Sequence, residues 1–305
     1  MNPPLPYSFQ RYLAAKKSVD DRALNREVAA ELARRVFMGQ SEVPLRILEV
    51  GCGIGVTLER LVERGILFNG AYTGIDLERA NIVEAEPRLE RFAAARKADL
   101  TWKDGGFILS GQNLKVRGAF EAIDLFDFIH REQGRRVWDL LLAHAFLDLT
   151  PLSAALPGML SLLKKRGTFC FTLNFDGATI FQPALELDEQ IEALYHGIMD
   201  ARRVDGQPTG GSRTGRQLFG HLQAAGATVL AAGPSDWVVF PGEDGYPQDE
   251  AYFLHFIIHT IHQALLGRPD LAPDRFQAWV EERRRQVERR KLVYIAHQLD
   301  FLGYI

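Results

Sequence analysis

Three glycines at alternate positions, directly after a short apolar run, constrain the fold of this chain more than any other feature. Residues 45–50 read Leu-Arg-Ile-Leu-Glu-Val and predict a buried strand, and Gly51, Gly53 and Gly55 follow it at once. Because glycine adopts backbone angles that side chains exclude, the chain can bend sharply there and come very close to a ligand. Glu49 adds an acidic side chain where the strand stops. We therefore expect a ligand-binding turn at the edge of a sheet.

Strand-like and helix-like segments alternate over the first half of the chain, which is typical of βαβ units and a parallel sheet. Strands are predicted at 45–50, 72–75, 107–109, 120–123, 139–144 and 168–173, and helices at 56–64, 82–95, 125–136 and 152–163. Before them, a four-residue apolar repeat predicts a helix within 10–38, with Asp20 or Asp21 as its cap.

The regular alternation of strand-like and helix-like segments ends after residue 177. The pattern then predicts, in order, a helix at 187–202, a Gly-rich loop at 205–215, a helix at 217–225, strands at 229–232 and 237–240, and helices at 249–266 and 274–300.

These segments predict an α/β fold: a doubly wound, mostly parallel seven-stranded sheet with added N-terminal, lid and C-terminal helices. The expected parts are an N-terminal helical cover (1–40), an α/β core that binds the ligand (41–177), an inserted lid helix and Gly-rich loop (178–215), the end of the sheet (216–245) and a C-terminal helical pair (246–305).

Composition narrows the class of protein. The 305 residues carry a formal net charge of −3, which argues against a protein that coats nucleic acid, because such surfaces need a basic excess. The two cysteines, Cys52 and Cys170, have no partners at metal-site spacing, so no metal is expected and a reducing, cytoplasmic setting fits. We expect neither a signal peptide nor a membrane span, since the start lacks the basic-then-apolar pattern and no apolar run is long enough.

The spacing of the glycines separates two kinds of nucleotide-like ligand. Dinucleotide-binding enzymes use G-x-G-x-x-G, and the third glycine of that pattern would fall on Val56. A pyrophosphate would also be repelled by Glu49, whereas a cationic or amino-bearing ligand would be attracted. The turn therefore favours a positively charged ligand over a dinucleotide.

Residues 49–55, Glu-Val-Gly-Cys-Gly-Ile-Gly, resemble the first motif of the class I S-adenosylmethionine-dependent methyltransferases. The resemblance covers residues 45–175 well and 215–240 loosely. It implies that S-adenosyl-L-methionine is the cofactor and S-adenosyl-L-homocysteine the product. The glycine loop would pack against the methionine and ribose parts of the cofactor, and Glu49 would support its amino-acid end.

The same resemblance assigns roles to the residues where later strands end. Asp76 would hold the ribose hydroxyls and Asp124 would face the adenine, each with the leucine that follows it, while the fourth strand would meet the cofactor near its sulfur. An alternative is that the two aspartates merely cap the helices that follow. By location alone, Tyr12, Lys16 and Arg22 of the N-terminal helix could also reach the cofactor carboxylate. The full cofactor-binding set is Glu49, Gly51, Gly53, Gly55, Asp76, Leu77, Asp124, Leu125, Ala143, His144, Tyr12 and Arg22.

The sequence indicates the residues that would bind the methyl acceptor less clearly than those that would bind the cofactor. His144 follows the fourth strand, and His196 shares a helix face with Asp200, so each could act as a base; a packed histidine and an ordinary polar helix face are the alternatives. The loop 210–216 could bind an anion or be a plain surface loop. The catalytic candidates are His144, Tyr195 and His196, and the substrate-binding candidates are Asp148, Asn174, Asp176, Tyr195, His196 and Arg213.

Two further signals predict ordinary surfaces. His255, His259 and His262 share one helix face but have no acidic or cysteine ligand beside them, so we expect a polar stripe rather than a metal site. The run 281–291 mixes arginines with glutamates, which predicts a solvated helix face, with nucleic-acid contact as the alternative.

The sequence thus predicts a methyltransferase, a transferase that uses S-adenosylmethionine on a small-molecule acceptor, as a monomer or homodimer without a membrane or nucleic-acid partner. The alternatives are an RNA methyltransferase, a non-catalytic protein that binds S-adenosylmethionine, and a pyridine-nucleotide-binding protein.

Overall fold

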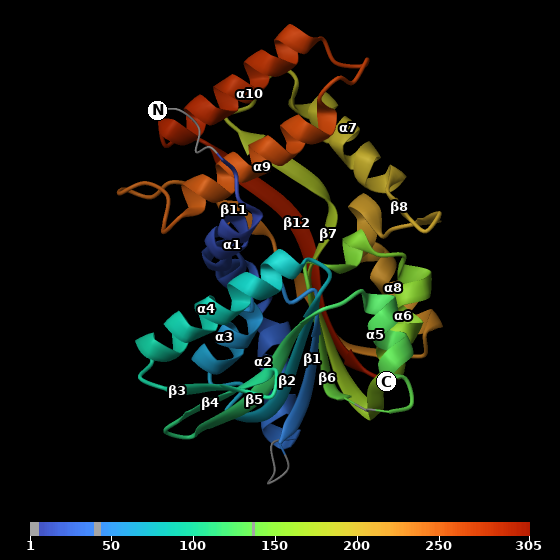
Figure 1. Cartoon of the computed structure of the whole chain (residues 1–305). Coiled ribbons are helices and arrows are strands. Elements are labelled where there is room, and N and C mark those ends of the chain that lie inside the picture. The colour runs from blue at the N-terminus through green and yellow to red at the C-terminus, as the bar shows by residue number, and fades with distance from the viewer. Residues whose placement is uncertain (1–5, 40–43, 136–137) are drawn as a thin grey trace.

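A large sheet runs through the centre of the molecule, with helices on both of its faces (Figure 1). The computed structural model describes residues 6–39, 44–135 and 138–305. The sheet contains ten strands in the order β10-β12-β7-β6-β1-β2-β5-β4-β3, with β11 paired to β12. Among the described helices, none combines the length and apolar character needed to cross a membrane.

Five strands in the middle of the sheet are parallel. They are β5 (Leu114–Ala122), β2 (Asn69–Asp76), β1 (Leu45–Val50), β6 (Trp138–His144) and β7 (Leu163–Gln182). Parallel strands need helical crossovers, which explains why their burial is nearly continuous and not alternating, as in Leu140–Ala143 of β6. The carboxyl ends of these strands therefore meet at one edge.

Two apolar layers hold the helices to the sheet. One face packs against α5 (Leu125–Glu132), α6 (Leu152–Ser161) and α8 (Thr214–Ala224). The other packs against α2 (Arg26–Gly39), α3 (Val56–Glu63) and α4 (Arg79–Ala95). Helices on both faces make the fold doubly wound, as the sequence predicts.

A third apolar cluster lies above the carboxyl edge of the sheet (Figure 1). It joins the long upper ends of β7 and β12 to the four helices α1 (Phe9–Ala23), α7 (Asp188–Ala201), α9 (Glu250–Leu265) and α10 (Pro273–Glu288). Short elements complete the chain: η1 (Leu147–Leu149), β8 (Arg203–Val204), β9 (Gln207–Pro208) and η2 (Gly211–Arg213).

The predicted fold class is confirmed, but the sheet has more than seven strands. The seven strands from β10 (Thr228–Pro234) to β5 form the doubly wound part, and the hairpin of β3 (Asp99–Lys103) and β4 (Gly106–Gly111) extends one edge. β11 (Trp237–Val239) pairs with β12 beyond the end of β10. β3 escapes prediction because its side chains are mostly exposed, so no buried apolar pattern marks it.

The prediction of a helix over 274–300 is wrong for its second half. α10 ends at Glu288, Arg290 adopts a positive φ of 54°, and Val293–Tyr304 forms β12. β12 lies antiparallel between β7 and the edge strand β10. Its many β-branched and aromatic residues favour a strand, so the C-terminal segment 246–305 is a helical pair followed by a sheet strand.

The N-terminal helix is also divided in two. Asn25 interrupts it, and its side-chain oxygen accepts hydrogen bonds of 3.1 Å from the amides of Glu27 and Val28 at the start of α2. Ser8 caps α1 through the amide of Arg11 at 3.3 Å. Asp20 and Asp21, predicted as caps, lie inside α1 instead.

Candidate functional site

A cavity of about 350 Å³ opens where the parallel strands end. Its size falls in the range of roughly 300–1,000 Å³ that is usual for ligand pockets, and its position at the carboxyl ends of the strands is the usual one for this class of sheet. The loops after β1, β2, β5 and β6 supply much of its wall, and α1 closes one side. From these elements come Gly51, Gly53, Asp76, Leu77, Asp124, Leu125, His144, Phe9, Leu13 and Lys16.

The glycine turn needs residues without a side chain. Gly51 has a φ of 69°, and a Cβ atom there would lie 2.5 Å from the ring of Phe146. Gly55 has a φ of 79° and caps α3, where a Cβ would meet Phe120 at 3.0 Å. Gly51 and Gly53 line the cavity, whereas Gly55 lies behind the turn and sets its shape. The turn thus brings bare backbone to the cavity wall.

Asp76 ties the end of β2 to this turn. Its Oδ2 accepts a hydrogen bond of 2.8 Å from the amide of Gly53. Its Oδ1 accepts from the amide of Glu78 at 2.9 Å and from the side chain of Asn81 at 3.1 Å. A carboxylate has about four acceptor positions, so these three bonds leave capacity for a ligand donor.

Asp124 both caps a helix and faces the cavity. Its Oδ1 accepts hydrogen bonds from the amides of Phe126 at 2.7 Å and Asp127 at 3.4 Å, at the start of α5. Asp124 and Leu125 also line the cavity. The two interpretations of this residue are therefore compatible, since both bonds go to one oxygen and the second oxygen remains available to a ligand.

Glu49 does not line the cavity. It is buried below the glycine turn, where the hydroxyl of Tyr72 donates a hydrogen bond of 2.5 Å to its Oε2. Burial raises the pKa of Glu49 to about 7, although the hydrogen bonds from Tyr72 and Thr57 oppose that rise. In the structure this carboxyl group is bound by Tyr72 and Thr57, inside the protein.

His144, at the end of β6, belongs to a buried polar network. Its Nδ1 lies 2.6 Å from Oγ1 of Thr172, and its Nε2 lies 3.2 Å from Oδ2 of Asp20 and 3.3 Å from Nη1 of Arg60. Burial and the nearby Arg60 charge lower the pKa of His144 to about 4. The imidazole is therefore neutral at neutral pH.

Asp20 anchors this network from α1. Its carboxylate contacts Lys16 at 3.1 Å and accepts a hydrogen bond of 2.9 Å from Nε1 of Trp237. Burial acts to raise the pKa of Asp20, but Lys16, His144 and Arg60 together hold it well below its usual range. An ionised Asp20 favours the tautomer of His144 with the proton on Nε2, and Nδ1 then accepts from the hydroxyl of Thr172. Both ring nitrogens are thus engaged inside the protein.

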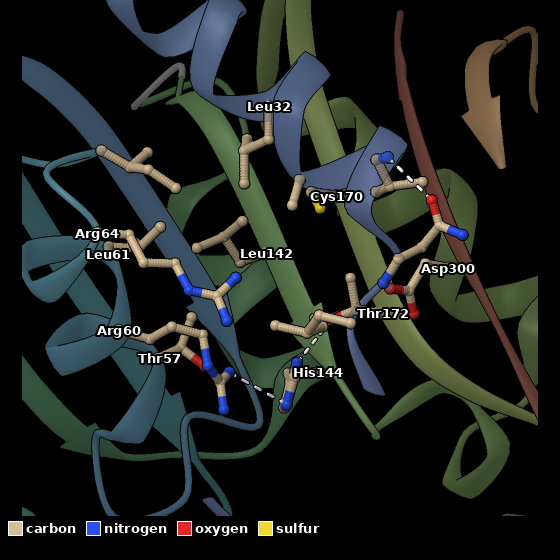
Figure 2. Close-up of a pocket in the computed structure, with 16 residues that line it drawn as sticks. Leu32, Thr57, Arg60, Leu61, Arg64, Leu142, His144, Cys170, Thr172 and Asp300 are labelled. Carbon is tan, nitrogen blue, oxygen red and sulfur yellow. Dashed lines mark hydrogen bonds between the residues drawn. The ribbon is translucent and has the colours of Figure 1, made fainter. Parts of the chain in front are cut away.

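A second, smaller hollow lies on the other side of His144 (Figure 2). It measures about 50 Å³ and is bounded by α2, α3 and the sheet. Figure 2 shows Leu32, Leu61 and Leu142 around it, with Arg60, Arg64 and His144 at its polar end. Ala143, predicted to meet the cofactor, lines this hollow and not the large cavity. The hollow is too small for a nucleoside.

Two residues of α1 predicted to bind the cofactor lie elsewhere. The ring of Tyr12 stacks on Phe253 and Phe256, with centroid distances of 5.6 and 4.3 Å. The guanidinium of Arg22 donates to both carboxylate oxygens of Glu250, at 2.5 and 2.8 Å. Both side chains fasten α1 to α9, and neither lines the cavity. α1 does cover the cavity, with Phe9, Leu13 and Lys16. Of these three, the sequence singles out Lys16 by its location and does not single out Phe9 or Leu13.

Asn174 and Asp176, expected at the acceptor mouth, make structural contacts instead. Asn174 donates to the carbonyls of Phe171 and Leu299 at 3.0 and 2.8 Å, where β7 and β12 are irregular. Asp176 accepts from the amide and Nε of Arg216 at 2.9 and 2.8 Å. Neither residue lines the cavity.

The predicted pairing of His196 with Asp200 does not form. Nε2 of His196 lies 3.0 Å from Oγ1 of Thr179, and Asp200 accepts a hydrogen bond of 2.7 Å from the amide of Ser212. Asp200 and Asp176 therefore occupy the loop amides that could have bound an anion. Arg213 lies in η2, where its charge helps lower the pKa of His196, after the larger effect of burial.

Two histidines of the α9 stripe, His259 and His262, contact aromatic rings. Across the described residues, no group of three or more histidine, cysteine, aspartate or glutamate side chains could hold a metal ion. His259 stacks on Tyr7 with a centroid distance of 4.1 Å. In the basic run of α10, Arg283 is fully buried and donates to Asp188 and to the carbonyl of Pro183, so that face is partly packed and not wholly solvated.

Among known proteins, those similar to this chain are solved structures. No family model matches the chain, and no curated protein matches its sequence. Similar solved structures include a putative methyltransferase from Bacillus halodurans C-125, with 13% identity, a TM-score of 0.49, and coverage of 90% of this chain and 98% of that one. A methyltransferase from Thiobacillus denitrificans in complex with S-adenosyl-L-homocysteine has 14% identity, a TM-score of 0.45 and 99% coverage of both chains. A putative sarcosine dimethylglycine methyltransferase from Galdieria sulphuraria has 12% identity and a TM-score of 0.44, covering 91% of this chain and 83% of that one.

At such identities the likeness concerns the fold. The doubly wound sheet, the glycine turn after β1 and the aspartates that end β2 and follow β5 are all present in one arrangement. In its fold, the chain resembles the class I S-adenosylmethionine-dependent methyltransferases.

Proposed function

We propose that this protein transfers a methyl group from S-adenosylmethionine to a small-molecule acceptor. The single observation that carries the proposal is the position of Asp76. Its carboxylate accepts a hydrogen bond from the amide of Gly53 in the glycine turn, and it borders the cavity of about 350 Å³ at the carboxyl ends of the parallel strands. An acidic group beside bare backbone suits a ligand that carries ribose hydroxyls and a positive charge.

The residues present fit the cofactor. The turn at Gly51 leaves room that a Cβ would fill, Asp76 retains acceptor capacity for ribose hydroxyls, and one oxygen of Asp124 is available to an amino group. Asp76 does not separate the two ligands, because an acidic residue at the end of the second strand also binds the ribose of NAD. A dinucleotide fits less well because Val56 stands where its pattern has the third glycine.

When bound, S-adenosylmethionine supplies a strongly electrophilic methyl group on its sulfonium, so the protein mainly has to orient an acceptor and exclude water. Phe9, Leu13, Phe146 and Leu149 provide apolar walls for that purpose. Holding reactants in the right geometry can lower a barrier by roughly 7–11 kcal/mol in favourable intramolecular reactions. No dedicated catalytic dyad is required.

His144 acts as a positioning residue in this proposal. Its ring is neutral and hydrogen-bonded at both nitrogens, to Thr172 and Asp20, so it holds the end of β6 and α1 together beside the cavity. Taking a proton from an acceptor would require it to give up one of these bonds.

A small acceptor is favoured over RNA. The net charge of −3 provides no general attraction for phosphates. The basic run of α10 is also partly used inside the protein, since Arg283 is buried and Arg285 pairs with Glu282 at 3.0 Å. Both cysteines are free and buried, which fits a cytoplasmic protein, and we propose a monomer or homodimer.

Calorimetric titration of the purified chain with S-adenosylmethionine, S-adenosylhomocysteine and NAD(P) tests the cofactor. The proposal expects both adenosyl ligands to bind and NAD(P) not to bind. Radiolabelled methyl transfer to pools of small amines, acids and phenols, compared with transfer to total RNA, then tests the acceptor class.

A further inference from the structure

Of the three α1 residues expected near the cofactor carboxylate, one is available to it. Tyr12 stacks on α9, and Arg22 pairs with Glu250 of α9. Lys16 instead lines the large cavity, and its side chain is buried. The other charged residues that line this cavity are all acidic: Asp76, Glu78 and Asp124. An anionic group in the cavity is therefore attracted at Lys16 and repelled by the other charges of the wall.

α1 crosses the ends of three neighbouring strands in the order they have in the sheet, β2, β1 and β6. Near β2, the side chain of Gln10 donates to Asn81 at 3.0 Å, and Asn81 donates to Asp76 at 3.1 Å. One turn further along the helix, Leu13 lies against the turn that follows β1, because a Cβ atom at Gly53 would be 3.3 Å from it. The first two turns of α1 thus pass from the proposed ribose position to the glycine turn.

Lys16 follows Leu13 by one more turn, on the same face of α1. It pairs with Oδ2 of Asp20 at 3.1 Å, and this oxygen lies 3.2 Å from Nε2 of His144, at the end of β6. These contacts place Lys16 on the other side of the glycine turn from Asp76. A ligand that is held at Asp76 and extends across the turn would therefore reach Lys16.

The ion pair with Asp20 leaves Lys16 able to bind a further anion. An ammonium group has three donors, and Asp20 is the one carboxylate within salt-bridge distance of Lys16 among the described residues. Asp20 is itself shared, since it accepts a hydrogen bond of 2.9 Å from Trp237 and lies 4.0 Å from Arg60. The salt bridges connected to this pair join four cations to three carboxylates, namely Lys16, Lys17, Arg60 and Arg64 to Asp20, Asp21 and Glu63. Over the part of the chain that the structure describes, this network carries one positive charge in excess.

We propose that Lys16 binds the carboxylate of the amino-acid tail of S-adenosylmethionine. This inference rests on the proposed function. In that cofactor the tail leaves the sugar at its 5′ carbon, opposite the hydroxyls that Asp76 would hold, so the tail extends toward Lys16. The carboxylate balances the excess positive charge and accepts a charge-assisted hydrogen bond from a buried ammonium group.

The test compares two ligands by calorimetry on the purified full chain. S-adenosylhomocysteine carries the carboxylate. Its decarboxylated analogue, 5′-(3-aminopropylthio)-5′-deoxyadenosine, keeps the adenosine, the sulfur and the amine but lacks the carboxylate. We expect the wild type to bind S-adenosylhomocysteine about ten to a hundred times more tightly than the analogue, as a hydrogen bond between charged groups implies.

Two variants assign this preference to a residue. Lys16→Met removes the ammonium group and keeps an unbranched apolar side chain, so it should lower the affinity for S-adenosylhomocysteine by the same factor and should not lower the affinity for the analogue. Lys17→Met is the matched control, because Lys17 is the next residue of α1, pairs with Asp21 and Glu63, and does not line the cavity. Lys17→Met should keep the preference of the wild type.

Removing one charge of a buried ion pair can destabilise a fold. Binding of the analogue reports that Lys16→Met is folded. If it is not folded, the double variant Lys16→Met/Asp20→Asn, which removes both charges of the pair, takes its place and should bind the two ligands with equal affinity.

Equal affinity of the wild type for the two ligands would overturn this inference and leave the proposed function standing. A preference that persists without the ammonium group of Lys16 would also overturn it, and would leave Lys16 to an acidic group of the acceptor. A preference that is lost equally in Lys17→Met would show a general effect of charge and overturn it too. If the wild type binds neither ligand, the proposed function fails and the inference fails with it.

Discussion

The amide of Gly53 donates a hydrogen bond of 2.8 Å to Oδ2 of Asp76, so the end of β2 holds the turn that follows β1. One carboxylate thereby fixes the backbone of the glycine turn and presents its remaining acceptor capacity to the cavity. The shape of the site and its affinity for a ligand consequently depend on the same residue.

Gly51→Ala should destabilise the fold and weaken binding of S-adenosylhomocysteine. The new Cβ would carry a φ of 69° and lie 2.5 Å from Phe146, so the turn must shift. We expect a loss of about 1–3 kcal/mol in the free energy of unfolding, measured by chemical denaturation. Gly65→Ala is the control, because Gly65 has a φ of 65° with no atom within 4 Å of the new Cβ. A loss no larger than that of the control would show that the close approach at Gly51 is unimportant.

Glu49→Gln should change how stability depends on pH. Burial raises the pKa of Glu49 to about 7 from its ordinary value of 4.5, so the folded protein holds this proton more tightly than the unfolded chain does. The contribution of Glu49 to stability is therefore complete below pH 4.5 and is lost as pH rises toward 7, by about 3 kcal/mol in all.

Thermal melts of the wild type and Glu49→Gln at several pH values between 4.5 and 8 measure this effect. As pH rises, the melting temperature of the wild type should fall relative to that of the variant. A difference that stays constant with pH would contradict the buried position of this carboxyl group beside Tyr72.

His144→Gln should have the opposite pH signature. Burial and Arg60 lower the pKa of His144 to about 4 from 6.5, so the unfolded chain binds this proton more tightly than the folded protein does. Its contribution to stability is complete above pH 6.5 and is lost as pH falls toward 4, by about 3 kcal/mol.

Chemical denaturation at pH 5 and pH 7.5 tests this prediction, with His130→Gln on the exposed side of α5 as the control. The wild type should lose more stability than His144→Gln between the two values. Equal losses would show that His144 is not held neutral by its surroundings.

RNA binding should be weak and should lack a steep dependence on salt. A surface that neutralises several phosphates would lose about 10³–10⁵ in affinity between 50 and 200 mM salt. We expect no such loss in fluorescence anisotropy with a short labelled RNA, because the basic run of α10 is interspersed with glutamates and partly buried at Arg283. A steep slope that is abolished by Arg289→Ala and Arg290→Ala would favour the RNA alternative.

The sequence predicts the cavity-lining residues at the strand ends better than those on other elements, for a physical reason. Gly51, Asp76 and Asp124 stand at strand ends, and parallel strands bring their carboxyl ends to one edge whatever the rest of the chain does. Asn174 and Asp176 follow the predicted strand 168–173, but in the structure β7 continues to Gln182 and pairs with β12. Both residues therefore lie within β7, and neither lines the cavity. The length of β7 thus depends on its pairing with β12, which is distant in the sequence.

Contacts between distant helices account for the other differences. Tyr12 stacks on Phe256 of α9, and Arg22 donates a hydrogen bond to Glu250 of α9. The residues near Tyr12 and Arg22 in the sequence do not indicate that α9 packs against them. Of the three α1 residues expected near the cofactor, Lys16 lines the cavity and the other two do not, because the packing of the helix decides which of its side chains face the cavity. The pattern predicts helix into β12 because no proline or glycine lies between the end of α10 at Glu288 and the start of β12 at Val293.

Calorimetric titration of Asp76→Ala, beside the wild type and Asp270→Ala, tests the central claim most directly. We predict that the wild type and Asp270→Ala bind S-adenosylhomocysteine with the same affinity, that neither binds NAD, and that Asp76→Ala loses measurable binding while remaining folded by circular dichroism. Undiminished binding of S-adenosylhomocysteine by Asp76→Ala, or binding of NAD alone by the wild type, would contradict the account.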